Sequence, residues 1–177
     1  ATTFWVDGFQ LEQKPYATSF INGTRVTETL TIPTAGVLNP QEGTIDLTYI
    51  SNHGTNGSGD RFILSAGIDY ASNEFRVEYR NNDRWYLKVG YMVGEYITPL
   101  SANIPVALAV RWDSSTVALF VNGSKVIQIN AVFANLSLGD VLAIGSSVAN
   151  WNWSYQCNGL IDDLRIDKIA RSDEEIS

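Results

Sequence analysis

The sequence has too few residues of several types to support whole classes of protein chemistry. The only cysteine, Cys157, provides neither a disulfide framework nor a thiolate metal cluster, so we expect a buried and unreactive thiol. The only histidine, His53, lies in a run of Gly, Asn and Ser, and no Gly-x-Ser-x-Gly motif of a serine hydrolase occurs. We expect His53 to be a solvated loop residue, with a ligand contact or a weak metal role as the alternatives.

Long apolar runs and an excess of positive charge are also missing. No run is long enough to span a membrane and no leader-like start occurs, so we expect a mature or excised soluble module, with residues 1–3 at a cut point. The chain has 19 acidic and 12 basic residues, and its net charge of -7 repels phosphate backbones and anionic membranes. A neutral ligand is more compatible with this balance.

Short strands are the dominant pattern that the sequence does contain. In the stretch 104–126, two runs of alternating apolar residues, 106–112 and 117–121, are followed by Asn122-Gly123. Asn-Gly between apolar runs is the strongest local indication of a β-hairpin, because both residues tolerate positive φ. Both faces of these strands are partly apolar, which predicts a position inside a two-sheet stack and not on a half-solvated sheet.

Further strands are predicted along the chain, with turn residues at a spacing of about 8–12 residues. The predicted strands cover residues 4–11, 25–32, 44–50, 61–68, 74–80, 85–93, 126–129, 141–144 and 159–167. A capping-box pattern at 172–175 indicates at most one short C-terminal helix. We therefore predict an all-β fold, a two-sheet antiparallel jelly-roll sandwich that forms a single domain over 1–177, with 1–15 as opening strand and connection.

Several segments carry a resemblance to a known family. They are VALAVRWD at 106–113, VALFVNG at 117–123, IGS at 144–146 and NGLIDDLRI at 158–166. In this order they resemble the laminin-G-like, concanavalin-A-like jelly-roll domains of bacterial surface, polysaccharide-degrading and phage tail proteins. The resemblance implies two curved antiparallel sheets and a core position for Trp112. Members of this superfamily bind sugars, bind proteins or hydrolyse glycans, so the function has to be inferred from individual residues.

The acidic residues do not follow the pattern of a glycoside hydrolase. Glycoside hydrolysis needs two carboxyl groups about 5–10 Å apart on either side of the scissile bond. Glycanases with the resembled fold usually carry alternating acids on one strand, and no Glu-x-Asp-x-x-Glu cluster occurs here. Glu74 and Glu78 are interleaved with arginines, which we expect to lower the pKa of both carboxyl groups. We therefore predict a domain that binds without catalysing a reaction.

Aromatic residues are the positive indication of sugar binding. Trp151, Trp153 and Tyr155 occupy alternate positions beside Asn150 and Asn152, in a polar segment before the last predicted strand. The flat C–H faces of sugar rings stack on aromatic rings, and amide groups bind sugar hydroxyls, so this segment is our first candidate surface. The alternative is that one or two of these rings cap the end of the core.

A second candidate surface lies on the two predicted strands 74–80 and 85–93 and the residues after them. Its members are Trp85, Tyr86, Tyr91 and Tyr96, with Arg76, Arg80 and Lys88 near Tyr86. Aromatic sheet faces of this kind are often core. Only the half that contains Tyr86 and the basic residues is therefore expected to reach a ligand.

Asp162 and Asp163 are adjacent on the last predicted strand and should point to opposite faces, so one of them would need a partner if it were buried. The family resemblance implies a structural calcium ion held by such an aspartate and by the first strand, where Asp7 and Glu12 lie. An ion pair with Arg165 or another arginine is the alternative.

Two functions of different class stay open. The first is a non-catalytic carbohydrate-binding module that attaches a secreted or surface protein to a polysaccharide or glycan, as part of a larger multidomain protein. The second is a structural or adhesive module of a phage tail or cell-surface assembly. The Trp and Tyr set favours the first, because a spacer has no need for exposed aromatic residues. Both functions imply an extracellular, cell-surface or virion location.

Overall fold

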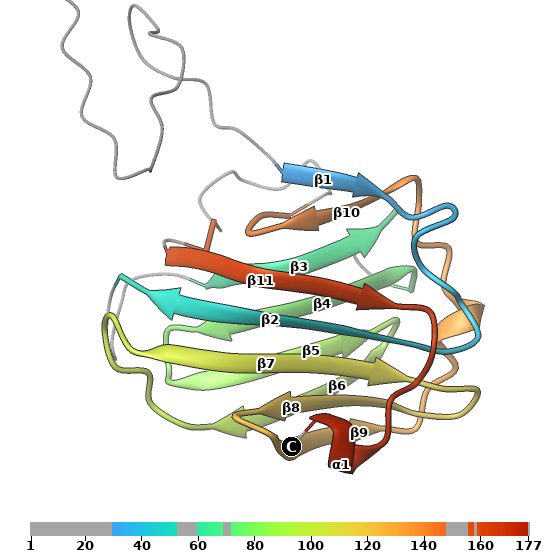
Figure 1. Cartoon of the computed structure of the whole chain (residues 1–177). Coiled ribbons are helices and arrows are strands. Elements are labelled where there is room, and N and C mark those ends of the chain that lie inside the picture. The colour runs from blue at the N-terminus through green and yellow to red at the C-terminus, as the bar shows by residue number, and fades with distance from the viewer. Residues whose placement is uncertain (1–29, 53–59, 69–71, 148–155, 158, 177) are drawn as a thin grey trace, which may run out of the picture.

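Two antiparallel sheets packed face to face make up the computed structural model, which describes residues 30–52, 60–68, 72–147, 156–157 and 159–176 (Figure 1). The strands are β1 (Leu30–Pro33), β2 (Gly43–Ser51), β3 (Arg61–Gly67), β4 (Glu74–Arg80), β5 (Arg84–Val89), β6 (Met92–Ile97), β7 (Pro105–Trp112), β8 (Val117–Val121), β9 (Ser124–Ile129), β10 (Val141–Ile144) and β11 (Gly159–Asp167). A 3-10 helix, η1 (Phe133–Asn135), and an α-helix, α1 (Asp173–Ile176), are the other described elements. The predicted jelly-roll sandwich with one short C-terminal helix is confirmed.

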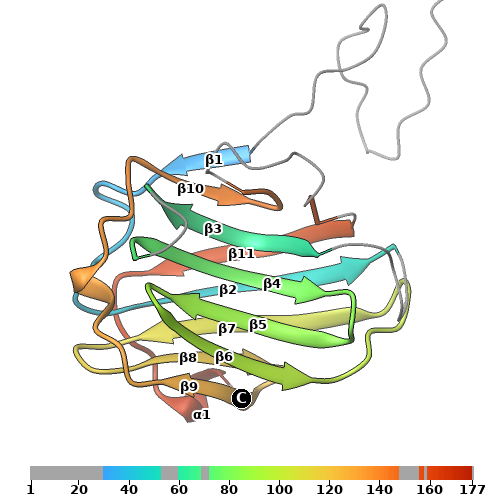
Figure 2. The same ribbon diagram turned by 180° about the vertical axis from the view of Figure 1, so that it is seen from behind.

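The strand order separates the chain into a six-stranded sheet A and a five-stranded sheet B within the described residues. Sheet A has the order β1-β10-β3-β4-β5-β6 and faces the viewer in Figure 2, with β1 at one edge and β6 at the other. Sheet B has the order β11-β2-β7-β8-β9 and faces the viewer in Figure 1. In this part of the chain no helix is long and apolar enough to span a membrane.

The core lies between the sheets and consists of alternate residues of paired strands. In sheet B, Leu47 pairs with Leu108, and in sheet A, Val77 pairs with Leu87. All four side chains are buried, because residues that pair across antiparallel strands share one face of the sheet. The alternation in the sequence therefore identifies the core face of both sheets correctly.

Trp112 lies in the core at the end of β7, as the family resemblance implies. Its ring stacks on Phe133 with the ring centroids 4.6 Å apart, and its Nε1 donates a hydrogen bond of 2.8 Å to the carbonyl oxygen of Asn39. Gly43 pairs with Trp112 across the strands, and a Cβ at Gly43 would lie 2.2 Å from the indole ring. Glycine is therefore required at this position of β2.

The hairpin between β8 and β9 forms at Asn122-Gly123, as predicted. The φ angles are 49° at Asn122 and 77° at Gly123, both in the left-handed region that a tight hairpin turn of this kind requires. The side-chain Oδ1 of Asn122 accepts a hydrogen bond of 3.0 Å from the backbone N–H of Ala107, which ties the turn to β7.

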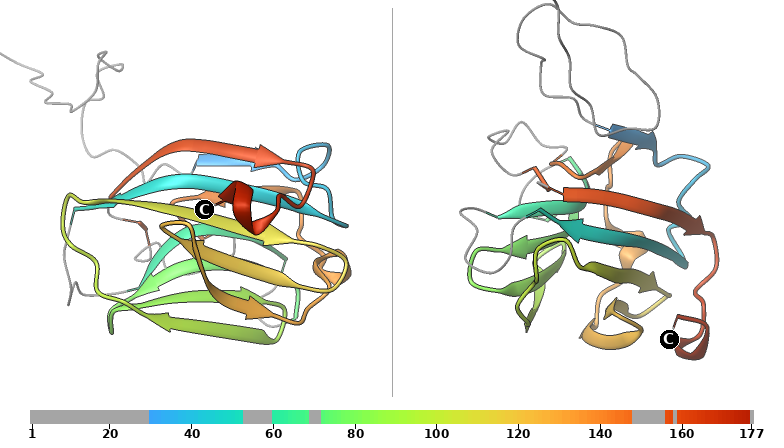
Figure 3. Two further views of the ribbon diagram at one scale, coloured as in Figure 1. Left: turned by 60° about the horizontal axis from the view of Figure 1, so that its bottom comes forward. Right: turned by 60° about the vertical axis from the view of Figure 1, so that its left-hand side comes forward.

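The outer face of β7 and β8 is covered by α1 (Figure 3). Ala109, Ala118 and Phe120 form a small apolar cluster on this face, and Ile176 packs against it. The predicted capping box is present, because Ser172 Oγ accepts from the N–H of Glu175 while Glu175 Oε2 accepts from the N–H of Ser172. The second apolar face of the central strands is therefore accounted for by a short helix.

The predicted strand 85–93 is wrong in one respect, because the chain turns at Gly90 and Tyr91 before β6 begins. Gly90 has a φ of 58°, a conformation that glycine adopts at little cost and other residues adopt rarely. The turn leaves the side chain of Tyr91 exposed, whereas the alternation in the sequence places it on the core face with Trp85.

Candidate functional site

The outer face of sheet A carries charged side chains from β4, β5 and β6. Arg76 pairs with Lys88, and Glu78 pairs with Tyr86, which in turn pairs with Glu95, so these residues share the face opposite the core. We use the name charged cluster for the set Glu74, Arg76, Glu78, Arg80, Arg84, Tyr86, Lys88 and Glu95. Because β4, β5 and β6 follow one another in the sequence and are joined by two hairpins, residues from a short stretch of sequence meet on one surface.

One end of the charged cluster is centred on Glu74. Its Oε2 accepts a hydrogen bond of 2.8 Å from Lys88 Nζ, and its Oε1 accepts one of 3.3 Å from Arg76 Nη1. None of these three side chains is more than 9% exposed. Charged side chains that are this deeply buried lose their hydration, and this desolvation cost offsets much of the Coulombic attraction between them. Each of the three charges therefore needs an opposite charge close by.

Glu78 lies in the middle of the charged cluster, between Arg76 and Arg80. Arg80 Nε donates a hydrogen bond to Glu78 Oε1, and Arg76 Nη2 lies 3.7 Å from the same oxygen. Burial raises the pKa of the Glu78 carboxyl group, although the two arginines act in the opposite direction. The predicted net lowering of this pKa is therefore wrong for Glu78, because desolvation of a fully buried carboxylate outweighs the effect of its ion pairs.

Tyr86 provides the ring against which the two arginines pack. The guanidinium carbon of Arg80 lies 3.4 Å from the ring centroid of Tyr86, and that of Arg76 lies 5.1 Å from it. Cation–π attraction therefore fixes both guanidinium groups against the ring. Arg76 and Tyr86 are only 2% and 6% exposed, so neither side chain is open to a ligand in this structure, contrary to the expected accessibility of this face.

The other end of the charged cluster reaches solvent. Arg80, Arg84 and Glu95 have side chains that are 25%, 27% and 35% exposed. Arg84 Nη1 forms an ion pair with Glu95 Oε2, and Arg80 Nη1 lies 3.6 Å from Glu95 Oε1. Two guanidinium groups and one carboxylate are therefore held together where a polar ligand can reach them.

Trp85 is a core residue, as expected for the half of the second candidate surface that lacks Tyr86 and the basic residues. Its side chain is fully buried, and its ring makes edge-to-face contacts with Tyr49 and Tyr79 at centroid distances of 6.3 and 5.0 Å. Tyr91 and Tyr96, in contrast, are exposed at the edge of sheet A. Only part of the predicted aromatic surface is therefore accessible.

Several predicted site residues lie outside the described residues. They are Asn150, Trp151, Asn152, Trp153 and Tyr155 of the first candidate surface, Asp7 and Glu12 of the calcium site, and His53. Their roles stay predictions.

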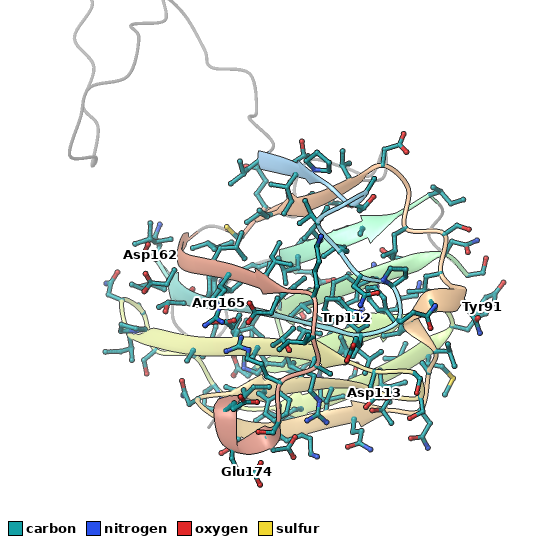
Figure 4. The ribbon with its side chains drawn as sticks, turned by 45° about the vertical axis from the view of Figure 1, so that its right-hand side comes forward. Tyr91, Trp112, Asp113, Asp162, Arg165 and Glu174 are labelled. Atoms are coloured by element: carbon teal, nitrogen blue, oxygen red, sulfur yellow. The ribbon has the colours of Figure 1, made fainter. Side chains whose placement is uncertain are left out.

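Asp162, which is labelled in Figure 4, and Asp163 are both exposed, so neither is the buried acid that would need a partner. The register of β11 shifts after Asp162, and Asp163 has a φ of 52°, which marks a β-bulge and explains why the simple alternation fails. Arg165 pairs with Asp167 at 3.0 Å, which also makes the expected pair with Arg165 wrong.

The described residues do not by themselves form a calcium site. They include no group of three or more His, Cys, Asp or Glu side chains that could hold a metal ion. Two exposed carboxylates fall short of the about six to eight oxygen ligands that calcium takes. The calcium ion therefore stays a prediction that depends on Asp7 and Glu12.

Cys157 is half-buried, where the sequence predicts a buried thiol. Its backbone carbonyl oxygen accepts a hydrogen bond of 2.7 Å from the Tyr49 hydroxyl group, which ties the start of β11 to the core. Burial raises the pKa of the Cys157 thiol, and a thiol that stays protonated is a poor nucleophile, as predicted.

Comparisons with known proteins agree with the predicted family resemblance. A model of the Laminin_G_3 family, described as concanavalin A-like lectin/glucanases superfamily, matches residues 22–177. No curated protein matches the sequence.

Solved structures of similar fold include a binding module and two sialidases. The CBM40 module of the Ruminococcus gnavus IT-sialidase has a TM-score of 0.63 and 16% identity, over 78% of this chain and 82% of that one. The K499G mutant of NanB sialidase from Streptococcus pneumoniae has a TM-score of 0.65 and 16% identity, over 84% of this chain and 26% of that one. Trypanosoma rangeli sialidase has a TM-score of 0.62 and 13% identity, over 77% of this chain and 22% of that one. At these identities the likeness shows the fold alone. The family model, which spans most of the sequence, shows that the chain belongs to the concanavalin A-like lectin/glucanases superfamily.

Proposed function

We propose that this domain is a non-catalytic glycan-binding module, and that the exposed end of the charged cluster, Arg80, Arg84 and Glu95, is part of its sugar-binding surface. The observation that carries the proposal is the charged cluster itself. A set of nearly buried ion pairs is no more stable than apolar residues of similar size, so stability alone does not account for it. Groups with perturbed pKa values gather at functional sites, and Glu78 is such a group.

The geometry at the exposed end suits a polar ligand. A guanidinium group donates paired hydrogen bonds to neighbouring hydroxyl groups or to a carboxylate, and a carboxylate group accepts hydrogen bonds from hydroxyl groups. The plane of Arg80 is held against the Tyr86 ring and its Nε is bound to Glu78. Because these contacts already order Arg80, little binding free energy would be spent on ordering its side chain when a ligand binds.

The local charge widens the range of ligands beyond the neutral sugars that the net charge favours. The charged cluster contains four basic residues, Arg76, Arg80, Arg84 and Lys88, and three acidic residues, Glu74, Glu78 and Glu95, which gives a local charge of about +1 with all seven groups ionised. The whole chain has a charge of -7. An acidic glycan is therefore less strongly repelled at this surface than the net charge suggests.

A module of similar fold supports a glycan ligand. The CBM40 module of the Ruminococcus gnavus IT-sialidase has been solved with α2,3 and with α2,6 sialyllactose bound. Its identity to this chain is 16% or less, so the likeness supports glycan binding as a class and does not transfer individual contacts.

The contacts of the acidic residues support binding without catalysis. Glu74, Glu78 and Glu95 each pair with at least two cationic side chains. Glu78 has the raised pKa of a general acid, but its side chain is 1% exposed and its Oε1 is bound by Arg80. A hydrolase needs a second carboxyl group placed across the scissile bond. We propose that the module attaches a secreted or surface protein, of which it is one domain, to a polysaccharide or glycan.

The experiment is a glycan array with neutral and acidic glycans, followed by calorimetric titration of the bound ones. Arg84→Ala should weaken binding by about 1.5–3 kcal/mol, because it removes a hydrogen bond from a charged donor. Arg84 pairs with a partly exposed Glu95, so its loss should hardly change stability. Arg165→Ala is the matched control, since it also breaks one exposed ion pair, on β11 of the other sheet.

Three outcomes would overturn the proposal. They are absence of binding to every glycan on the array, equal affinity of Arg84→Ala and Arg165→Ala, and release of reducing sugar from a bound glycan. Trp151→Ala and Trp153→Ala extend the experiment to the predicted stacking surface, where the loss of a ring should cost about 1–3 kcal/mol of binding free energy.

The alternative, a structural or adhesive module, is favoured by a different observation. Edge strand β6 exposes a run of apolar side chains that the glycan site does not use. An assembly module would need such a surface, and a monomeric sugar-binding domain would not.

A further inference from the structure

A hollow of about 240 Å³ lies on the outer side of sheet B beside α1, on the face of the sandwich opposite the charged cluster. Its lining includes Asp46 of β2, Ala107 of β7 and Asp163 of β11, together with Arg171 and Glu175 from the residues after β11. The volume is about eight times that of one water molecule in the liquid, so a ligand of the size of a single sugar ring fits into it.

Small side chains on neighbouring strands form the floor of the hollow. Thr48 pairs with Ala107 and Asp46 pairs with Ala109, so these four residues lie side by side on the outer face of β2 and β7. Phe120 of β8 extends the floor, because it pairs with Ala109. The hollow therefore has an apolar floor on β7 and β8 and polar groups along β2.

The β-bulge in β11 brings the carboxylate of Asp163 to this hollow. Ile161 and Leu164 both pack against the core, so Asp162 and Asp163 between them both lie on the outer side of the sheet. Among the described residues, the carboxylate of Asp163 has no hydrogen-bond or ion-pair partner, and only its backbone N–H is bound, by Asp162 Oδ1. Both carboxylate oxygens of Asp163 are therefore available to a ligand.

The other charged groups of the lining are already held in place. Asp46 forms an ion pair with Arg171, whose Nε lies 3.1 Å from Asp167 Oδ2. Glu175 Oε2 accepts a hydrogen bond of 2.8 Å from the backbone N–H of Ser172. A carboxylate accepts up to about four hydrogen bonds, so Asp46 and Glu175 keep acceptor positions for a ligand. Because their side chains are ordered beforehand, little binding free energy would be spent on ordering them.

The lining favours a ligand that donates hydrogen bonds and carries no negative charge. Its three carboxylates and one guanidinium group give a local charge of about -2 with all four groups ionised. The guanidinium group is Arg171, which is already paired with two aspartates. A neutral sugar residue matches this chemistry, because its hydroxyl groups donate to carboxylates and its C–H face packs on an apolar floor.

We propose that the hollow on sheet B is a second sugar site, which takes one neutral sugar residue with its C–H face against Ala107 and its hydroxyl groups on Asp46 and Asp163. The proposal goes beyond the glycan surface on sheet A and shares with it the class of ligand but no residue. The local charges of the two sites differ in sign, about +1 at the charged cluster and about -2 here. An acidic sugar therefore distinguishes them.

The first test is an NMR titration of the isotope-labelled full chain with the methyl glycosides of glucose, galactose and mannose, and with glucuronic acid. At least one neutral glycoside should shift the backbone amide signals of residues 46–48, 107–109 and 163, which surround the hollow. Glucuronic acid should leave these signals unchanged, because the negative lining repels it. The signals of residues 76–95 report on the charged cluster separately.

The second test compares two single-residue changes on β11. Asp163→Asn should weaken binding of the neutral glycoside about fivefold to tenfold, because hydrogen bonds to an ionised acceptor are roughly twice as strong as those to a neutral one. Asparagine also tolerates the positive φ at this position. Asp162→Asn is the matched control, since it makes the same change at an exposed residue outside the lining and keeps the Oδ1 that binds the N–H of Asp163.

A third variant fills the hollow. Ala107→Leu should abolish binding of the neutral glycoside, because the larger side chain would occupy the floor on which the sugar lies. Ala107 is exposed on β7, so the melting temperature should stay close to that of the wild type.

Four results would overturn the second site. They are no shift of the amide signals around the hollow with any of the three glycosides, equal shifts with glucuronic acid, equal loss of affinity in Asp163→Asn and Asp162→Asn, and wild-type affinity in Ala107→Leu. Failure of this site would leave the charged cluster untouched, because Arg84→Ala and the signals of residues 76–95 test that surface independently. Conversely, binding at the hollow with no response at residues 76–95 to any glycan would overturn the proposed surface on sheet A and leave this one.

Discussion

The outer faces of the two sheets differ in chemistry, although each sheet has its other face in the same core. On sheet B, the apolar cluster of Ala109, Ala118 and Phe120 is covered by Ile176 of α1. The apolar side chain of the helix therefore shields the apolar face of the sheet from water. On sheet A, Glu74, Arg76, Glu78 and Lys88 are buried as ion pairs. The first arrangement stabilises the fold directly, whereas the second loses most of its gain to desolvation. This difference is the physical basis on which we propose the glycan-binding surface on sheet A.

The ion pairs on the two sheets also differ in exposure. Asp46 pairs with Arg171 on the outer side of sheet B, where the two side chains are 31% and 13% exposed. Asp173 of α1 pairs with Arg111 and Lys125 and is itself 43% exposed. Exposed pairs of this kind contribute little free energy, because water screens them. The ion pairs of Asp173 position α1 over sheet B, and the packing of Ile176 against the apolar cluster stabilises α1 in this position.

The largest difference in the free energy of unfolding is expected when one basic side chain is removed from the outer face of each sheet. Arg76→Met should lower the free energy of unfolding by about 3–5 kcal/mol, because it leaves two buried carboxylates with one cation fewer each. Arg171→Met should cost about 0–1 kcal/mol, since its partners Asp46 and Asp167 are both partly solvated. Urea unfolding followed by tryptophan fluorescence measures both, and equal losses would contradict the distinction between the two faces.

A smaller effect is expected at the apolar cover of sheet B. Ile176→Ala should lower the free energy of unfolding by about 1–2 kcal/mol, less than the cost of truncating a fully buried isoleucine, because Ile176 is half-buried. Ile169→Ala is the matched control, since Ile169 is 59% exposed, and it should change stability by less than about 0.5 kcal/mol. The same urea midpoints measure both variants. Equal effects would mean that α1 adds nothing to the stability of sheet B.

The sequence predicts those parts of the fold that depend on local pattern. Alternation identifies the core face of β7 and β8, Asn122-Gly123 identifies the hairpin, and Ser172 with Glu175 identifies the start of α1. Each depends on residues that are neighbours in sequence, so no long-range information is needed.

The sequence does not predict what covers a face. Alternation places Arg76 and Tyr86 correctly on the side away from the core, but it gives no information on their burial, which depends on tertiary packing. Because the sequence does not show that Glu78 is buried, the expected lowering of its pKa is opposite to the direction in the structure. At Asp163 a β-bulge interrupts the alternation, and at Gly90 a turn ends a strand whose apolar pattern continues. The glycine was the one local indication of that turn.

The smallest expected effect is a pH dependence of opposite sign at Glu78 and Asp113. Burial raises the pKa of Glu78 in the folded protein above its ordinary value, which the unfolded chain retains. Between these two pKa values the folded state keeps a proton that the unfolded state has lost, so the contribution of Glu78 to the free energy of unfolding falls as the pH rises. Below both values the contribution is fully present, and above both it is lost.

Asp113 provides the control. Burial acts to raise its pKa, but hydrogen bonds from the backbone N–H groups of Ser115 and Thr116, together with their hydroxyl groups, outweigh that effect and lower the pKa below its ordinary value. Its contribution is therefore present above the pKa of the unfolded chain and is lost as the pH falls through the lower, folded value.

Urea unfolding of wild type, Glu78→Gln and Asp113→Asn at a series of pH values separates the two contributions, because the amides remove the titration and keep the shape of each side chain. The difference in free energy of unfolding between wild type and Glu78→Gln should fall as the pH rises above the ordinary pKa of glutamate. The difference between wild type and Asp113→Asn should rise with pH around and below the ordinary pKa of aspartate. If both differences changed in the same direction, burial would not be the dominant influence on the pKa of Glu78. The desolvation of buried charges would then not distinguish the outer face of sheet A from that of sheet B.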